Sequence, residues 1–252
     1  MNNTHDLWLQ SWPARLTPLV DFVCIAGAGA GASRFKPWQT LMPGFCALHV
    51  VQLPGRENRI DEPPNDDMAV VVEQIAASCM EKTKKHRPLI LFGHSMGAVL
   101  AYELAHRLQL NGNSPAALVL SATTPPTGQS DRPAPDDDDL KRRLLAFDAG
   151  NQSVVDNPDL FSSLAPALRA DFQLLRRHSI APERKLTDVS TMLLVGKSDP
   201  VVPAASVALW KKHLGDGVSE HGFDGGHQFP FQESLRPVTR LMSDLVKQRI
   251  SR

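Results

Sequence analysis

One stretch of the chain, residues 89–101, constrains the fold more than any other. A short apolar run, Leu89–Phe92, leads into Gly93-His94-Ser95-Met96-Gly97, and a helix-forming run follows at once. The pattern Gly-x-Ser-x-Gly between a strand and a helix predicts a sharp turn that lifts the Ser95 side chain above the edge of a sheet. Both glycines suit this turn because side chains at those positions would collide across it. The stretch therefore predicts that Ser95 is a nucleophile.

A pattern this short also occurs by chance in loops, so its context decides the interpretation. Leu89–Phe92 predicts a buried strand and Ala98–Leu108 predicts a helix, which is the flanking structure that such a turn requires. In that geometry the Met96 amide can point at a developing oxyanion. The positive end of the helix then lies under Ser95 and favours negative charge there.

Length and composition set the broad class. The chain has 252 residues, 42% hydrophobic and 21% charged, which predicts one α/β domain over residues 1–252. Lysine plus arginine equals aspartate plus glutamate at 27 each, so the net charge does not suggest a nucleic-acid partner. No apolar run approaches the ~18–20 residues that span a bilayer, and the first residues lack a signal-peptide pattern. We therefore expect a cytoplasmic monomer with no membrane partner.

Neither the cysteines nor the acidic run predicts a metal site. Cys24, Cys46 and Cys79 show neither metal-ligand nor disulfide spacing, which suits reduced thiols in the cytosol. Asp136–Asp139 resembles a metal cluster, but consecutive carboxylates at a helix start cap that helix and interact favourably with its dipole. We expect neither a metal nor a cofactor.

Strands and helices alternate along the chain. The predicted strands besides the one before Ser95 are Val20–Ile25, Leu48–Leu53, Ala116–Ser121, Thr191–Val195 and Val218–Phe223, with one short edge strand within residues 1–19. The predicted helices besides the one after Ser95 are a short one over Phe35–Met42 and longer ones over Asp66–Lys82, Leu164–His178, Val202–Leu214 and Phe231–Ile250. This alternation predicts a mostly parallel sheet covered by helices on both faces. From about residue 127 to 187 short helical pieces replace the strands, which predicts a helical lid inserted over an active site.

A serine nucleophile needs a base in contact with it and an acid that orients the base. Hydrolases of this architecture carry them in the order serine, acid, histidine. Of the nine histidines, His227 is the one in a strand-end loop downstream of an acid. Asp199 directly follows the strand Thr191–Val195, whereas Asp224 is too near His227 in sequence to be the first choice. The predicted catalytic residues are therefore Ser95, Asp199 and His227.

The loop Ala26–Ser33, which follows the first long strand, is rich in glycine and alanine. It resembles a dinucleotide-binding fingerprint, but no third glycine stands at the required offset and the next strand ends in Gln52-Leu53-Pro54-Gly55, without an acidic residue for a ribose. A loop of small residues also lets backbone N–H groups approach a reacting carbonyl. We predict that Ala28 donates to the oxyanion together with Met96, and Gly29 is the alternative.

Several stretches, in order over about residues 20–230, resemble the type II thioesterases that accompany nonribosomal peptide and polyketide synthases. They are Cys24–Trp38, Gln52–Arg59, Gly93–Ala98 with Tyr102–Ala105, Leu168–Phe172, Gly196–Pro200 and Gly225–His227. The resemblance implies an α/β-hydrolase fold and hydrolysis of an acyl or aminoacyl thioester. The implied substrate is attached to the phosphopantetheine arm of an acyl or peptidyl carrier, and the implied role is editing or release, without a metal or cofactor.

Two stretches differ from the family pattern. Ala26–Ala30 stands where the family usually has Pro-x-Ala-Gly-Gly, and Arg176-Arg177-His178 stands where Glu-x-Tyr is common. Arg176 and Arg177 have two open interpretations, contact with an acidic carrier domain or a solvated helix face. Two other functions compete with the thioesterase: a carboxylesterase of the same fold that acts on free small esters, and a non-catalytic binding module. The intact serine, aspartate and histidine set argues against the binding module.

Overall fold

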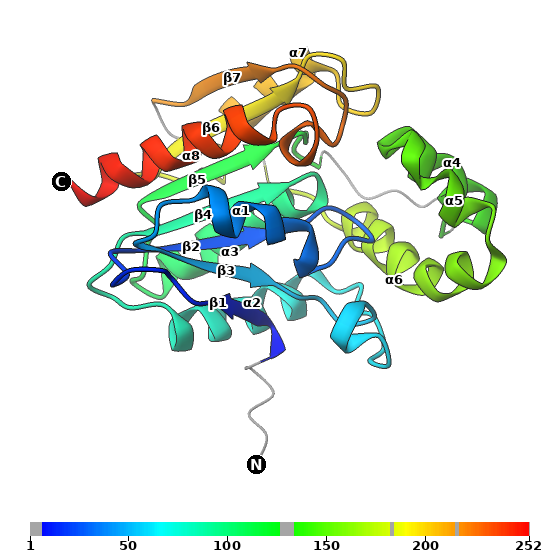
Figure 1. Ribbon diagram of the computed structural model, residues 1–252, viewed down its shortest axis with the longest axis horizontal. Helices are drawn as coiled ribbons and strands as arrows, with labels where there is room; N and C mark the ends of the chain where they lie inside the picture. The colour runs from blue at the N-terminus through cyan, green and yellow to red at the C-terminus, as the bar shows by residue number, and fades with distance from the viewer. Residues whose placement is uncertain (1–6, 127–133, 182–183, 215–216, 252) are drawn as a thin grey trace.

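The computed structural model describes residues 7–126, 134–181, 184–214 and 217–251. In this part of the chain seven strands form one sheet in the order β1-β3-β2-β4-β5-β6-β7 (Figure 1). The strands are β1 (Leu9–Trp12), β2 (Val20–Ile25), β3 (Cys46–Val51), β4 (Leu89–His94), β5 (Ala117–Ser121), β6 (Ser190–Gly196) and β7 (Ser219–Phe223). β1 pairs antiparallel with β3, and the other strand pairs are parallel. The predicted mostly parallel sheet and the N-terminal edge strand are confirmed.

Helices cover both faces of the sheet. In Figure 1, α1 (Lys36–Leu41) and α8 (Leu235–Ile250) lie in front of the sheet, and α2 (Met68–Lys82) and α3 (Met96–Leu110) lie behind it. Side chains alternate along β2, so that Phe22 and Cys24 pack in the core under α1 and α8 while Val23 and Ile25 pack in the core under α2 and α3. The central strands β2 to β5 are therefore buried along their whole length.

The strand order reverses between β2 and β4. The chain passes from β2 to β3 on one side and then returns to form β4 on the other side of β2. In open α/β sheets, ligands bind outside the carboxyl ends of the strands at such a reversal. The loop Ala26–Ser33 follows β2 and Ser95 follows β4, so both predicted site segments lie at this point.

A helical segment, α4–α6, connects β5 to β6. It comprises α4 (Asp137–Phe147), α5 (Gln152–Val155) and α6 (Pro158–Arg177), which lie beyond one end of the sheet (Figure 1). As predicted, carboxylates cap α4, since Asp136 accepts from the Asp139 N–H. Asn157 caps α6 in the same way. The segment has its own apolar cluster, formed by Leu140, Leu144, Phe161, Ala165, Leu168 and Phe172. Residues 127–133 and 182–183 of the predicted lid lie outside the described residues.

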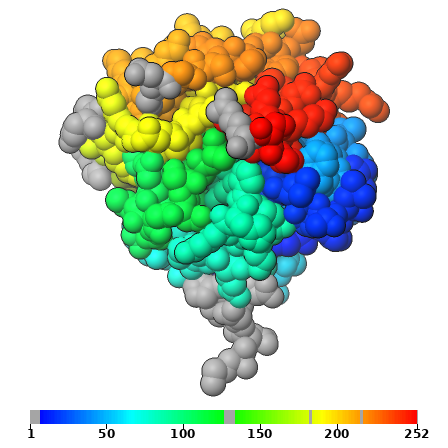
Figure 2. All heavy atoms as spheres, turned by 90° about the vertical axis from the view of Figure 1, so that its left-hand side faces the viewer, coloured from blue at the N-terminus to red at the C-terminus, as the bar shows by residue number. Residues whose placement is uncertain are grey.

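Figure 2 views the molecule from the end opposite this segment and shows the chain from β6 onward, coloured yellow to red, lying together above the earlier part of the chain. None of the helices in the described ranges is both long enough and apolar enough to cross a membrane.

Some helices differ in extent from the prediction. The helix predicted from Leu164 begins earlier, at Pro158, because Asn157 accepts from two backbone N–H groups and proline suits the first helical turn. The helix predicted over Val202–Leu214 is instead one α-helical turn, α7 (Ala204–Val207), followed by a 3-10 helix over Ala208–Lys212. Within that 3-10 helix the buried indole of Trp210 donates to the Thr123 carbonyl oxygen at 3.0 Å, which ties it to the end of β5.

Candidate active site

The turn after β4 holds Ser95 in an unusual backbone conformation. Its φ is 55° and its ψ is −121°, a region that residues with a Cβ rarely adopt. A Cβ on Gly93 would lie 2.1 Å from the Gly97 carbonyl oxygen, and a Cβ on Gly97 would lie 2.3 Å from the Ile25 carbonyl oxygen. The predicted need for glycine at both positions is confirmed. At Gly97, however, the obstacle is the end of β2 and not the turn itself.

The structure brings Ser95, His227 and Asp199 into one hydrogen-bonded chain. Ser95 Oγ lies 3.0 Å from His227 Nε2, and His227 Nδ1 lies 2.8 Å from Asp199 Oδ2. The side chains of His227 and Asp199 are each 1% exposed, so water does not compete for this contact. With its proton on Nδ1, His227 donates to Asp199, and Nε2 accepts from the Ser95 hydroxyl.

Two strand-end loops position the acid and the histidine. Asp199 follows β6, and its Oδ1 accepts from the N–H groups of Val201 and Val202 at 2.8 and 3.0 Å. His227 follows β7. The two loops are joined by the Ser198 N–H, which donates to the Gly225 carbonyl oxygen at 3.1 Å. One carboxylate oxygen of Asp199 therefore fixes its own turn, and the other is left for His227.

Two further rings surround His227. The centroid of the His94 ring lies 5.2 Å from that of His227. The pKa of His94 lies well below its usual value, mainly because the ring is buried and secondarily because His227 and Arg34 are nearby. His94 is therefore neutral and places no positive charge beside His227. On another side Phe147, the last residue of α4, stacks on the His227 ring at 4.9 Å with an interplanar angle of 19°. No sequence pattern indicates this role for Phe147, because only the folded helical segment brings it next to His227.

In the described part of the chain, several backbone N–H groups of the loop after β2 have protein acceptors, but that of Ala28 does not. The N–H of Gly29 donates to Asp171 Oδ2 at 2.8 Å, that of Ala30 to the Gly27 carbonyl oxygen at 3.1 Å, and that of Ala32 to Gln52 Oε1 at 2.7 Å. Gly29, the alternative oxyanion donor, is thus already engaged. Within the described ranges no acceptor contacts the Ala28 N–H. Ala28 lines a cavity of about 20 Å³ together with Ser95 and His227.

Sequence reasoning missed the contact between Arg56 and Asp171. These residues belong to stretches that served only to establish the family resemblance. In the structure they form a buried ion pair, with Arg56 Nη1 at 2.6 Å from Asp171 Oδ2 and Nη2 at 2.9 Å from Oδ1. The two positions are 115 residues apart, so no local pattern pairs them.

A larger cavity opens beside Ser95. Its volume is about 840 Å³, within the range of small-molecule sites. The lining comes from α3, α4, α6 and the loops after β5 and β6, and combines apolar with charged side chains: Val99, Phe147, Phe172, Leu175 and Val201 with Asp136, Asp139, Arg143 and Arg176. Arg177, next to Arg176, instead pairs with Asp66 on the surface. The cavity has the size and mixed character needed to hold an acyl group beside the serine.

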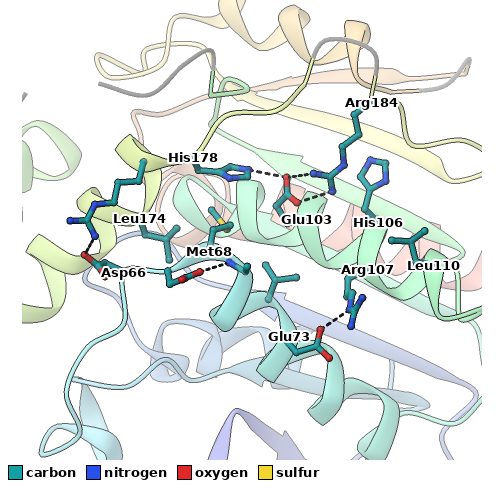
Figure 3. Close-up of a pocket in the computed structure, with 14 residues that line it drawn as sticks. Asp66, Met68, Glu73, Glu103, His106, Arg107, Leu110, Leu174, His178 and Arg184 are labelled. Atoms are coloured by element: carbon teal, nitrogen blue, oxygen red, sulfur yellow. Dashed lines mark hydrogen bonds and ion pairs between the residues drawn. The ribbon is translucent and has the colours of Figure 1, made fainter. Parts of the chain in front are cut away.

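A second cavity, of about 650 Å³, lies between α2, α3 and the end of α6 (Figure 3). Most of its charged side chains form ion pairs. Glu103 accepts from Arg184 at 2.7 Å and contacts His178 Nε2 at 2.9 Å, and Arg107 contacts Glu73 at 2.6 Å. Ser95, Asp199 and His227 are not among its lining residues. We therefore place the candidate active site at the cavity beside Ser95.

The cysteines are expected to be chemically inert in the native protein. All three are free and buried, and burial raises the pKa of Cys46 and Cys79 to about 12 and raises that of Cys24 as well. Because the thiolate is the reactive form, iodoacetamide should leave the activity intact, and a thiol reagent such as Ellman's should react with all three only after denaturation. Rapid labelling of the native protein with loss of activity would contradict this expectation. No group of three or more metal-binding side chains is found in the described part of the chain.

Comparisons with known proteins agree with this geometry. The family described as Thioesterase domain matches residues 21–247. Thioesterase PikA5 of Streptomyces venezuelae is 32% identical over 251 residues, which cover 97% of this chain and 87% of that protein. A probable cadicidin biosynthesis thioesterase of Streptomyces griseus is 28% identical, and the chain covers 63% of its length. The solved structure of YbtT, a type II thioesterase from the yersiniabactin NRPS/PKS pathway, is 28% identical with a TM-score of 0.84, covering 96% of this chain and 99% of that chain.

The family match extends over most of the chain, and the likeness to the solved thioesterase covers nearly all of it. The predicted α/β-hydrolase fold and the resemblance to type II thioesterases are confirmed. The chain therefore belongs to the thioesterase domain family, and it is a thioester hydrolase.

Proposed function

We propose that the enzyme transfers the acyl group first to Ser95 and then to water. His227 Nε2 takes the hydroxyl proton while Ser95 Oγ attacks the thioester carbonyl carbon. When the carbon–sulfur bond breaks, His227 gives this proton to the leaving thiolate. A water molecule then attacks the acyl-serine, with His227 taking a proton from the water and returning it to Ser95 Oγ. The products are a carboxylic acid and a free thiol.

In this mechanism Asp199 orients His227 and stabilises the imidazolium that forms in each half of the reaction. The N–H groups of Met96 and Ala28 hold the oxyanion of the two tetrahedral intermediates, and each such donor is worth roughly 10²–10³ in rate. The observation that carries the proposal is the continuous chain Asp199–His227–Ser95, with contacts of 2.8 and 3.0 Å, beside a cavity of about 840 Å³.

The substrate we propose is an acyl or aminoacyl group on the phosphopantetheine thiol of an acyl or peptidyl carrier. The support comes from relatives named as biosynthesis thioesterases and from a solved type II thioesterase of an NRPS/PKS pathway. The enzyme would clear such groups in editing or release them as products. No step needs a metal or cofactor, since the pantetheine arm belongs to the substrate.

We propose further that the α4–α6 segment, within about residues 127–187, acts as a lid on a single domain. Its Phe147 stacks on His227, and both α4 and α6 line the cavity beside Ser95. A closing segment of this kind excludes water and positions the acyl group. The enzyme would work as a monomer in the cytoplasm.

The experiment that tests the substrate compares the same acyl group attached to three leaving groups. They are the phosphopantetheine thiol of a carrier protein, the thiol of N-acetylcysteamine and the hydroxyl of p-nitrophenol. Because a carrier protein adds contacts remote from the reacting carbon, we expect kcat/KM for the carrier thioester to exceed that for the ester by about a hundred-fold or more. Equal or faster turnover of the p-nitrophenyl ester would instead identify a carboxylesterase of the same fold.

A further inference from the structure

A buried carboxylate in the helical segment contacts the loop that carries the proposed oxyanion donor. Asp171 lies in α6 and is 1% exposed. Its Oδ2 accepts from the Gly29 N–H at 2.8 Å and from Arg56 Nη1 at 2.6 Å, and its Oδ1 accepts from Arg56 Nη2 at 2.9 Å. One side chain thus joins three separate parts of the chain: α6, the turn after β3 and the loop after β2.

The hydrogen bond from the Gly29 N–H to Asp171 goes beyond what the ion pair with Arg56 requires. Arg56 alone neutralises the carboxylate with two parallel hydrogen bonds. The additional bond from Gly29 fixes a peptide plane that also contains the Ala28 carbonyl group, and so it fixes the backbone at Ala28. The Ala28 N–H belongs to the preceding peptide group, on the other side of the Ala28 Cα, so its direction depends on this contact.

The same helix holds Gly29 by packing. Gly29 has a φ of +75°, and a Cβ at this position would lie 3.0 Å from Leu168 Cδ1. Leu168 lies three residues before Asp171 in α6, so the two side chains point from the same face of the helix. Gly29 therefore receives a hydrogen-bond acceptor and a fully buried apolar contact from one element.

The far end of the loop is anchored to the turn after β3. Gln52 accepts from the Ala32 N–H at 2.7 Å through Oε1 and donates through Nε2 to the Arg56 carbonyl oxygen at 2.9 Å. The loop is thus held by α6 at Gly29 and by the turn after β3 at Ala32. Arg56 connects both anchors, because its guanidinium contacts Asp171 and its backbone contacts Gln52.

We propose that Asp171 is a positioning residue that completes the oxyanion site only when the helical segment α4–α6 is seated on the sheet. This inference rests on the proposed roles of Ser95 and Ala28. If α6 moves away, the Gly29 N–H loses its acceptor and the backbone at Ala28 is released. Closure of the cavity and assembly of the oxyanion site are then one event, so an enzyme with an unseated segment retains its serine and histidine but stabilises the tetrahedral intermediate poorly.

The test uses two double variants that remove the ion pair without leaving a charge buried. Arg56→Met/Asp171→Asn keeps a carbonyl oxygen that can accept from the Gly29 N–H, and Arg56→Met/Asp171→Leu has similar size but no acceptor. We expect the leucine variant to lose about 10²-fold in kcat relative to the asparagine variant, with KM changed by less than about threefold, because one oxyanion donor is misplaced. Its Ki for an alkyl boronic acid, which forms a tetrahedral adduct on serine, should rise by a similar factor.

A matched control removes another buried ion pair, between Asp21 and Arg87, which lies near the start of β2, at the opposite end of that strand from the loop at Ala28. Arg87→Met/Asp21→Leu should lower Tm but keep kcat and the boronic acid Ki within about threefold of wild type. Equal kcat and Ki in the asparagine and leucine variants would overturn the inference. So would a loss in the control as large as that in the leucine variant at comparable Tm.

A single substitution keeps the test decisive if the leucine variant does not fold. Asp171→Glu retains the charge opposite Arg56 but moves the carboxylate by one methylene, and we expect its boronic acid Ki to rise at least tenfold; an unchanged Ki would overturn the inference. Labelling of wild-type Ser95 by a fluorophosphonate separates the two proposals. Without labelling, the proposed mechanism fails; with labelling and unaffected variants, the positioning role alone fails.

Discussion

Substitution of Ser95 by alanine is expected to lower kcat for thioester hydrolysis by about 10⁶-fold, the loss typical of removing the nucleophile from a serine triad. Without Oγ no acyl-enzyme forms, and His227 can only assist direct attack by water. The variant should still accelerate hydrolysis by about 10³–10⁴-fold over the uncatalysed reaction, because the proposed oxyanion donors and the cavity are intact. Alanine keeps the Cβ at position 95, so Tm should stay close to that of wild type.

This loss is measured by single-turnover hydrolysis of a loaded carrier protein with quantification of the released acid. Ser121→Ala is the matched control. Ser121 is also a serine at a strand end, and it is buried. Its Oγ contacts His94 Nδ1 at 3.1 Å, whereas Ser95 Oγ contacts His227. Its kcat should stay within about tenfold of wild type. A Ser95→Ala enzyme that retained a tenth of the wild-type rate would exclude Ser95 as the nucleophile.

The second large effect is expected for Asp199→Asn, with a loss of about 10⁴-fold in kcat. Asparagine can keep its carbonyl oxygen on the N–H groups of Val201 and Val202, where Asp199 Oδ1 now lies. Its amide N–H then faces His227 Nδ1, which must accept, so the imidazole proton moves to Nε2. In this tautomer His227 cannot accept the proton of Ser95, and the base is lost while the turn is preserved.

Asp224→Asn is the control for this prediction, because Asp224 is the other acid near His227 in sequence. Its side chain is 84% exposed and pairs with Lys197 at 2.7 Å, so its replacement should leave kcat within about threefold of wild type. Both enzymes should have the Tm of wild type, measured by calorimetry or by circular dichroism. A larger loss in Asp224→Asn than in Asp199→Asn would show that the acid had been assigned to the wrong loop.

The sequence was most informative where structure depends on neighbouring residues. The turn around Ser95 follows from the spacing of Gly93 and Gly97, and the alternation of strands and helices led to a parallel sheet. The rule that function lies at the carboxyl ends of parallel strands then selected Asp199 and His227 without any knowledge of their distance. The structure places the three side chains in direct contact.

The sequence was least informative where distant segments meet. The contact of Asp171 with Gly29 joins positions 142 residues apart, and it engages the Gly29 N–H, the alternative to Ala28 as the proposed oxyanion donor. Phe147 reaches His227 only because α4 folds back over the sheet end. The region Val202–Leu214 has helical periodicity, but part of it forms a tighter 3-10 helix. In that helix Trp210 is bonded to the segment after β5, a contact that local periodicity does not reveal.

The backbone of Ser95 has a consequence for how this enzyme can be stabilised or evolve. A φ of 55° suits glycine better than serine, and a residue held in such a region costs on the order of 1–3 kcal/mol. The chain therefore loses stability at the position of the proposed nucleophile. Selection for thermal stability alone would favour a glycine at position 95, and we expect it to yield a more stable protein with the same fold and without the proposed nucleophile.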